Sequence, residues 1–252
     1  MAIPYLRRLT AVSRSPQANR HLAYVLTFTA GAVNAGGFLA VQQYTSHMSG
    51  IVSMMADNLA LGGVIVVLQG LAALLSFLAG AASSAFLINF GRRSRLTSEY
   101  AMPLLYEAVL LLGFGLLGAN LETLRWFYVP GTVMLLCYIM GLQNAMITKL
   151  SRSEIRTTHV TGMVTDIGIE LGKLFYWNMA KGDPASMRPV RADRSKLVVL
   201  TVLVSLFFVG GVTGAYSFFN FGFGSTVPLA LMLMALAAVP IVDDIRSLLP
   251  RM

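Results

Sequence analysis

Long apolar segments recur along the chain and restrict what it can fold into. Several of them reach the ~20 residues that a helix needs to cross the ~30 Å hydrocarbon layer of a bilayer. A hydrophobic fraction of 56% with only 12% charged residues excludes an ordinary soluble domain. We therefore predict an all-α, polytopic helical membrane protein with about six transmembrane helices. The expected spans are residues 21–41, 64–90, 103–119, 126–148, 197–219 and 228–242.

Basic residues are distributed unevenly between the loops. If the six segments cross the membrane, both chain ends and the loops near residues 91–99, 149–156 and 173–196 lie on one side. That side then holds all of the 19 Lys and Arg residues except Arg125. Cytoplasmic loops carry such an excess of Lys and Arg, so we place the N- and C-termini in the cytoplasm. We read the net charge of +8 as membrane topology and expect no nucleic-acid partner.

A polar motif occurs twice within otherwise apolar sequence. The first copy is Thr-Ser-His-Met-Ser-Gly at residues 45–50, and the second is Thr-Thr-His-Val-Thr-Gly at residues 157–162. Each copy follows a Gly-x-x-Asn-Ala signature, which begins at Gly31 in the first half and at Gly141 in the second. The same order of hydroxyl, imidazole and glycine in both halves indicates an internal duplication.

The duplication predicts how the chain is organised. We expect one integral membrane domain over residues 1–252, with a first repeat at about residues 21–120 and a second at about 126–248. Each repeat holds three crossings, which is an odd number, so the second repeat is expected to be inverted relative to the first. The two motifs then enter the membrane from opposite sides, each followed by a short re-entrant or interfacial helix. Inverted repeats with interrupted helices are common in secondary transporters.

The motif supplies groups that suit a binding site at membrane depth. The exposed N-terminus of the short helix presents amides and partial positive charge to an anion or a carboxylate. The two His residues can donate hydrogen bonds or titrate near neutral pH. Capping of the helix by Ser49 or Thr161, and bracing of the turn by Asn34 or Asn144, are the structural alternatives. The residues expected to bind substrate are Asn34, Thr45, Ser46, His47, Ser49, Gly50, Asn144, Thr158, His159, Thr161 and Gly162.

Three acidic residues are candidates for a coupling-ion or proton site, namely Asp57, Glu107 and Glu170. Ionisable groups in membrane segments are costly and usually face a cavity or a partner. Two of the three have structural alternatives. Glu107 is able to pair with an Arg of residues 92–95, and Glu170 with Lys173 three residues later on the same helix.

The first Gly-x-x-Asn-Ala signature and the motif at residues 45–50 also resemble those of the YoaK-like family of six-span bacterial membrane proteins, a domain of unknown function. The resemblance covers nearly the whole chain. It implies a multi-pass protein of the bacterial inner membrane and supplies no substrate. The family pattern continues with Asn after the last glycine of the motif, whereas this chain has Ile51.

These features favour a secondary transporter or channel-like permease for a small anionic or zwitterionic solute, with proton coupling as one option. The expected partners are the lipid bilayer and that solute, and a homodimer is compatible with so small a bundle. An intramembrane enzyme and a non-transporting sensor or partner subunit are the alternatives. The single Cys137 and two duplicated His residues make a small set of metal ligands, and no Gly-x-Ser-x-Gly turn occurs. We expect no metal, no cofactor and no catalytic residue.

Overall fold

The computed structural model describes residues 16–41, 43–96, 98–118, 125–150, 160–176 and 190–248. Every regular element within those ranges is a helix, so the all-α prediction is confirmed for them. The elements are α2 (Pro16–Val41), α3 (Met48–Ala60), α4 (Val64–Arg93), α5 (Ala101–Gly118), α6 (Arg125–Leu150), α7 (Val160–Phe175), α8 (Arg194–Phe221), the 3₁₀ turn η1 (Gly222–Ser225) and α9 (Thr226–Leu248).

Five segments of the described chain are long and apolar enough to cross a membrane, which makes this a multi-pass membrane protein. They are Gln17–Leu39, Val64–Arg93, Ala101–Gly118, Val129–Lys149 and Arg194–Arg246. The last of them takes in α8, η1 and most of α9, so the number of crossings depends on whether η1 divides it.

Glycines and one acidic side chain set several helix ends. Gly62 follows α3 with a φ of +79°, in the left-handed region that favours glycine, and it lies in the turn between α3 and α4. Gly222 ends α8 in the same region with a φ of +57°. Asp193 caps the start of α8, because its side chain accepts a hydrogen bond from the amide of Lys196 at 3.0 Å.

Two helices extend furthest beyond their predicted ends. α2 begins at Pro16 rather than near His21, and α9 continues to Leu248 rather than ending near Val242. Proline is well suited to the first turn of a helix, which explains the earlier start. The last turns of α9 carry charged residues, so apolar character alone does not locate its end.

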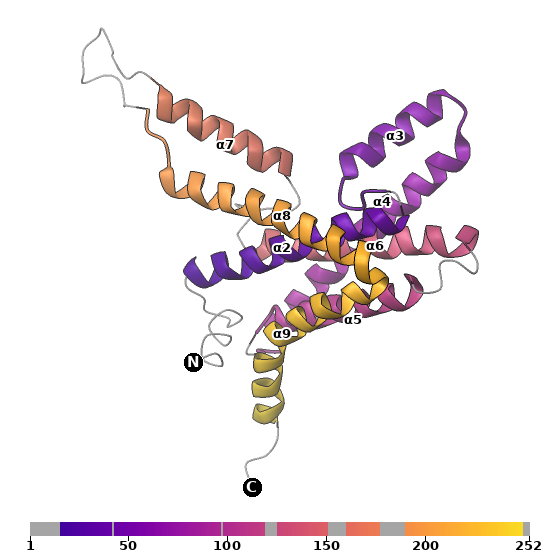
Figure 1. Ribbon diagram of the computed structural model, residues 1–252. Coiled ribbons are helices and arrows are strands. Elements are labelled where there is room, and N and C mark those ends of the chain that lie inside the picture. Colours follow the sequence, from indigo (N-terminus) through magenta and orange to yellow (C-terminus); the bar gives the residue numbers. More distant parts are fainter. Residues whose placement is uncertain are drawn as a thin grey trace.

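The long helices pack in pairs that join the two halves of the sequence. α2 lies along α8, α4 lies along α6, and α5 packs against α9 (Figure 1). Each short helix folds back on the long helix that follows it, α3 on α4 and α7 on α8. In Figure 1 the pairs α3–α4 and α7–α8 form two arms that spread apart above the bundle, and α2 and α6 run in opposite directions.

α2 and α8 pack backbone to backbone at two glycines. A Cβ atom placed on Gly31 of α2 would lie 2.1 Å from the carbonyl oxygen of Phe207 in α8. A Cβ atom on Gly210 of α8 would lie 2.1 Å from the carbonyl oxygen of Phe28 in α2. Small residues allow membrane helices to approach this closely, and any larger residue at either position would push the two backbones apart.

The same contact recurs between α4 and α6. Gly141 of α6 lies against the carbonyl of Phe77 in α4. Gly80 of α4 lies against the carbonyl of Tyr138 in α6. A Cβ atom placed on either glycine would lie 2.0 Å from the carbonyl oxygen that it faces. Gly31 and Gly141 each open the repeated Gly-x-x-Asn-Ala signature. The glycine of the signature therefore makes the equivalent helix contact in both halves of the chain.

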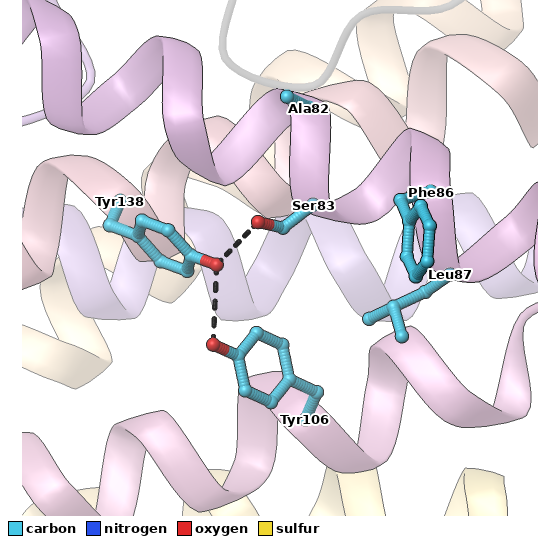
Figure 2. A pocket seen from close by; sticks show the side chains of 6 residues that line it. All are labelled: Ala82, Ser83, Phe86, Leu87, Tyr106 and Tyr138. Carbon is cyan, nitrogen blue, oxygen red and sulfur yellow. Dashed lines mark hydrogen bonds between the residues drawn. The ribbon is translucent and has the colours of Figure 1, made fainter.

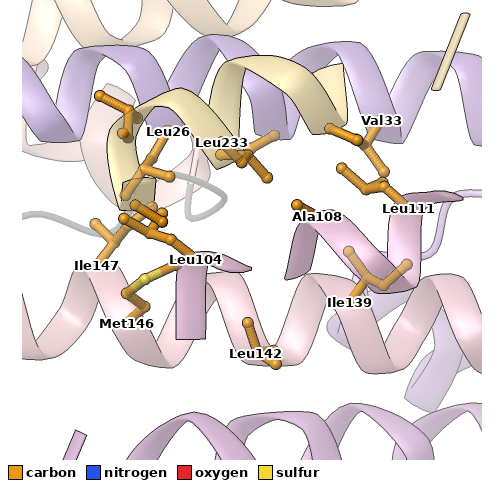
Figure 3. Packing of buried hydrophobic residues seen from close by; sticks show 14 of the residues in the cluster. Leu26, Val33, Leu104, Ala108, Leu111, Ile139, Leu142, Met146, Ile147 and Leu233 are labelled. Atoms are coloured by element: carbon orange, nitrogen blue, oxygen red, sulfur yellow. The ribbon is translucent and has the colours of Figure 1, made fainter. Parts of the chain in front are cut away.

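The main apolar core lies where α2, α5, α6 and α9 meet (Figure 3). Its side chains come from both halves of the sequence, so each half needs the other to bury its apolar side chains. The labelled members of this core are Leu26, Val33, Leu104, Ala108, Leu111, Ile139, Leu142, Met146, Ile147 and Leu233.

Candidate functional site

The first copy of the motif connects α2 to α3. His47 occupies the N-cap position of α3, its carbonyl accepts from the amide of Ile51 at 3.1 Å, and its side chain makes no capping hydrogen bond. The imidazole lies against Gly50, where a Cβ atom would be 2.4 Å from Nδ1. Glycine at position 50 is therefore needed for the ring to sit beside the first turn of α3. The prediction that Ser49 caps this helix is wrong, because α3 already begins at Met48.

Asn34 and Ser46 tie the motif to the preceding helix. The hydroxyl of Ser46 donates a hydrogen bond to Oδ1 of Asn34 at 2.8 Å, and Asn34 is buried on α2. The structure thus supports the bracing interpretation of Asn34 in the first repeat. Thr45 is fully buried beside them, and its Oγ1 atom has no hydrogen-bond partner among the described residues. A buried hydroxyl without a partner is costly, which marks Thr45 as a place where a ligand or water would be stabilised.

The second copy of the motif is only partly described. Thr158 and His159 lie outside the described residues, whereas Thr161 and Gly162 form the first turn of α7 and are exposed. Thr161 stands inside the helix rather than at its N-cap, so the prediction that it caps α7 is wrong. Asn144 is buried on α6, as Asn34 is on α2.

The two short helices are oriented alike. In Figure 1 the N-terminal ends of α3 and α7 point toward the middle of the molecule, and their C-terminal ends point away from it. A helix N-terminus carries partial positive charge and amides without an intrahelical acceptor. The arrangement therefore directs two groups of hydrogen-bond donors toward the centre.

A cavity of about 330 Å³ lies near the motif, between the first turns of α4 and of α6. Two amide side chains, Gln43 and Gln69, supply its polar lining, and Gln43 immediately precedes the exposed Tyr44 at the start of the motif segment. The volume is within the range of small-molecule sites, ~300–1,000 Å³. Neither glutamine is part of a sequence motif. Gln43 lies in the connection between α2 and α3 and Gln69 lies on α4, so they meet only because α3 folds back on α4.

The three acidic candidates have different surroundings. Asp57 is exposed on α3. Glu170 is buried on α7, where its Oε1 accepts from Nζ of Lys173 at 2.9 Å and its Oε2 accepts from the amide of Asp193 at 2.8 Å. The Lys173 ammonium and the Asp193 amide hold the pKa of Glu170 below its ordinary value. Of the two interpretations of Glu170, the geometry supports the ion pair.

Glu107 has the least usual environment of the three. It is fully buried on α5, and neither carboxyl oxygen has a hydrogen-bond partner among the described residues. The predicted alternative, a pairing with an Arg of residues 92–95, is wrong for Arg92, because Arg92 forms its ion pair with Glu99 instead. Glu107 is thus a buried acidic group with no described role in holding the fold.

One polar group was not anticipated from the sequence. Ser83 of α4, Tyr106 of α5 and Tyr138 of α6 meet at a cavity of about 400 Å³ (Figure 2). Tyr138 donates a hydrogen bond to Ser83 Oγ at 2.6 Å, and the hydroxyls of Tyr106 and Tyr138 are 3.2 Å apart. The three residues belong to three separate apolar segments, so no local pattern connects them.

Within the described residues, no three His, Cys, Asp or Glu side chains lie close enough to hold a metal ion. A family model for a protein of unknown function (DUF1275) matches residues 22–239. The chain belongs to this family. The match runs from α2 into α9 and includes both copies of the motif. A comparison with curated proteins finds no match, and neither does a comparison with solved structures.

Proposed function

We propose that this DUF1275 protein is a secondary transporter or permease for a small anionic or zwitterionic solute in the bacterial inner membrane. The observation that carries the proposal is the orientation of the two short helices, whose N-terminal ends both point toward the middle of the molecule (Figure 1). Each begins within one copy of the duplicated motif. Paired helix N-termini of this kind hold anionic substrate groups in transporters built from inverted repeats.

Six crossings fit the lengths of the helices. A continuous helix over the 53 residues of Arg194–Arg246 would be ~80 Å long at ~1.5 Å per residue, far more than the hydrocarbon layer requires. The 28 residues of α8 and the 23 of α9 are each sufficient alone. The positive φ of Gly222 and the η1 turn separate the two, which supports two crossings here.

Side-chain contacts favour the predicted sidedness. Arg20 near the start of α2 donates to Ser195 at the start of α8 at 3.2 Å. Lys149 at the end of α6 donates to Asn89 near the end of α4 at 3.2 Å. Basic residues therefore gather where these helix ends meet, as expected for a cytoplasmic face. This arrangement also supports an inverted second repeat and cytoplasmic termini.

The proposed substrate site combines the first turn of α3 with the neighbouring buried hydroxyl. The amides of Ser49 and Gly50 lie where a helix offers them no acceptor, and Thr45 offers an unpartnered hydroxyl. The Asn34–Ser46 hydrogen bond holds this turn to α2. A carboxylate or an inorganic anion would accept from these donors.

Glu107 is the proposed coupling residue. The carboxylate of Glu170 is paired with Lys173, and Asp57 is exposed on α3. Neither is therefore an isolated buried group that could bind and release a proton. Glu107 is buried within a span and has no described partner.

Counterflow in proteoliposomes tests the proposal. Vesicles loaded with unlabelled phosphate, sulfate, glycine or glutamate are diluted into the same labelled compound, and protein-dependent uptake is measured. We expect uptake of at least one of the four compounds, and Ser46→Ala should slow it by about 10-fold because the turn loses its tie to α2.

Ser76→Ala is the matched control. Ser76 donates to the carbonyl of Ala72 within its own helix, so its loss should leave uptake unchanged. The absence of protein-dependent uptake for all four compounds, or equal rates for the Ser46→Ala protein and the wild type, would contradict the proposal.

A further inference from the structure

The hydroxyl cavity between α4, α5 and α6 carries an inference that is independent of the proposed transport. Its polar atoms form one directed chain of hydrogen bonds. Ser83 donates to the carbonyl of Ala79 at 2.9 Å, so its oxygen accepts from Tyr138. The single proton of Tyr138 is engaged with Ser83. The remaining contact, at 3.2 Å, therefore has Tyr106 as the donor and Tyr138 as the acceptor.

This direction leaves the oxygen of Tyr106 at the head of the chain. Its lone pairs are available to accept a hydrogen bond, and no described residue donates to it. Tyr106 is 37% exposed, so a molecule arriving from outside the bundle can reach this oxygen. The Tyr106 hydroxyl donates to Tyr138 but accepts no hydrogen bond from the described residues, and a ligand with a donor would supply one. The chain ends at a backbone carbonyl and so offers no continuing path for a proton.

The rest of the cavity is apolar and aromatic. Figure 2 shows Phe86 and Leu87 on the side opposite the hydroxyl chain. The rings of Tyr106 and Tyr138 stand at 81° to each other with centroids 6.3 Å apart. Walls of this kind stack on or edge against an aromatic ring, which favours an aromatic ligand over an acyl chain.

The other half of the chain holds the equivalent cavity without the hydroxyl chain. A cavity of about 230 Å³ between α2, α8 and α9 is lined by Phe28 and Thr213. Phe28 is equivalent to Tyr138, since the carbonyl of each meets the matching glycine of the partner helix. Thr213 is equivalent to Ser83, since it also donates to the carbonyl four residues earlier.

Phe28 makes the contact between α2 and α8 without a hydroxyl. The equivalent contact between α4 and α6 therefore does not require the hydroxyl of Tyr138. The described lining of the equivalent cavity contains no tyrosine. We propose that the cavity between α4, α5 and α6 binds a lipid-soluble aromatic alcohol, a molecule with a phenol-type head that donates its hydroxyl proton to Tyr106.

Fluorine NMR on the full-length protein in nanodiscs tests this site, with 4-fluorophenol and 4-fluoroanisole as probes. Both carry the same ring, but only the phenol has a proton to donate. We expect the phenol to bind about 3- to 10-fold more tightly than the anisole, as one net hydrogen bond provides. Protein-free nanodiscs measure how each probe partitions into lipid.

Three variants separate the hydrogen bond from general apolar binding. In the Tyr106→Phe protein the two probes should bind with about equal affinity, because the oxygen that accepts from the phenol is gone. Tyr138→Phe frees the proton of Tyr106 to donate, so the anisole should bind more tightly than it does to the wild type. Tyr216→Phe, at an exposed position on α8, should change neither affinity.

The Tyr138→Phe protein is expected to fold, because Phe28 occupies the equivalent position in the other half of the same molecule. Equal affinities of the wild type for the two probes would overturn the proposal. A preference that persists in the Tyr106→Phe protein, or binding no greater than partition into empty nanodiscs, would overturn it as well.

Discussion

Buried polar groups decide which side chains of this protein are available for chemistry. Ser46 and Asn34 satisfy each other, and Glu170 is held by Lys173 and a backbone amide. Thr45 and Glu107 have no described partner for their side-chain oxygens. Burial without a partner is costly, so residues of this kind are better candidates for ligand or proton binding than satisfied ones.

Glu107→Gln tests the coupling role. The amide has the same shape and carries no charge, and there is no described ion pair to lose, so we expect the protein to fold. Uptake driven by a pH gradient should fall to background, while counterflow at equal pH continues. Rates of both kinds are measured in the same proteoliposomes.

Glu99→Gln is the control for Glu107, because Glu99 is also buried but forms an ion pair with Arg92. It should leave gradient-driven uptake intact. Gradient-driven uptake at the wild-type rate in the Glu107→Gln protein would contradict the proposal that Glu107 is the coupling residue.

Glu170 gives α7 a dependence on pH. Its pKa in the folded protein is lowered, so its ion pair stabilises α7 above the ordinary pKa of 4.5 and this contribution is lost as pH falls through the lowered value. A spin label at Phe175, which is exposed at the end of α7, should therefore keep one mobility from pH 8 to about pH 5 and become more mobile in more acidic buffer. In the Glu170→Gln protein it should have the higher mobility throughout. Equal mobility of the label in both proteins at pH 7 would show that the ion pair does not hold α7.

At the scale of elements, the sequence allows the helices to be located but not their partners. Apolar runs predicted most helix positions to within a few residues. The pairing of α2 with α8 and of α4 with α6 depends on contacts between distant segments, which no local pattern encodes. The repeated signature did single out Gly31 and Gly141, although their role in helix packing became clear only from the carbonyls they face.

Gly31→Ala and Gly141→Ala test these equivalent contacts. Each added methyl would meet a backbone oxygen, so we expect each variant to lose about 1–3 kcal/mol of stability. Gly113→Ala on α5 is the matched control, since its Cβ would have open space, and it should be neutral or gain up to ~1 kcal/mol from better helix propensity. Thermal unfolding in detergent measures all three. A loss at only one of the two signature glycines would argue against equivalent interfaces.

At the scale of the whole molecule, the charge asymmetry and the duplicated motif were visible in the sequence. The position of the motif after a long helix was predicted, but only residues 45–47 precede the short helix and residues 48–50 form its first turn. The bracing of the turn by Asn34 was one of two predicted options. The burial of Thr45, the glutamine-lined cavity and the hydroxyl chain of Tyr106 were not predictable. Each depends on side chains that are brought together by packing between separate helices.

The central claim is that the two repeats are inverted, and the turns after α3 and α7 test it most directly. Leu61 and Tyr176 follow these two helices and are exposed, whereas Cys137 is fully buried. In a Cys137→Ala background, single cysteines at positions 61 and 176 are treated with a membrane-impermeant thiol reagent in intact cells. We predict that position 61 is labelled from outside and position 176 only after permeabilisation. Labelling of both positions from the same side would contradict the inverted arrangement.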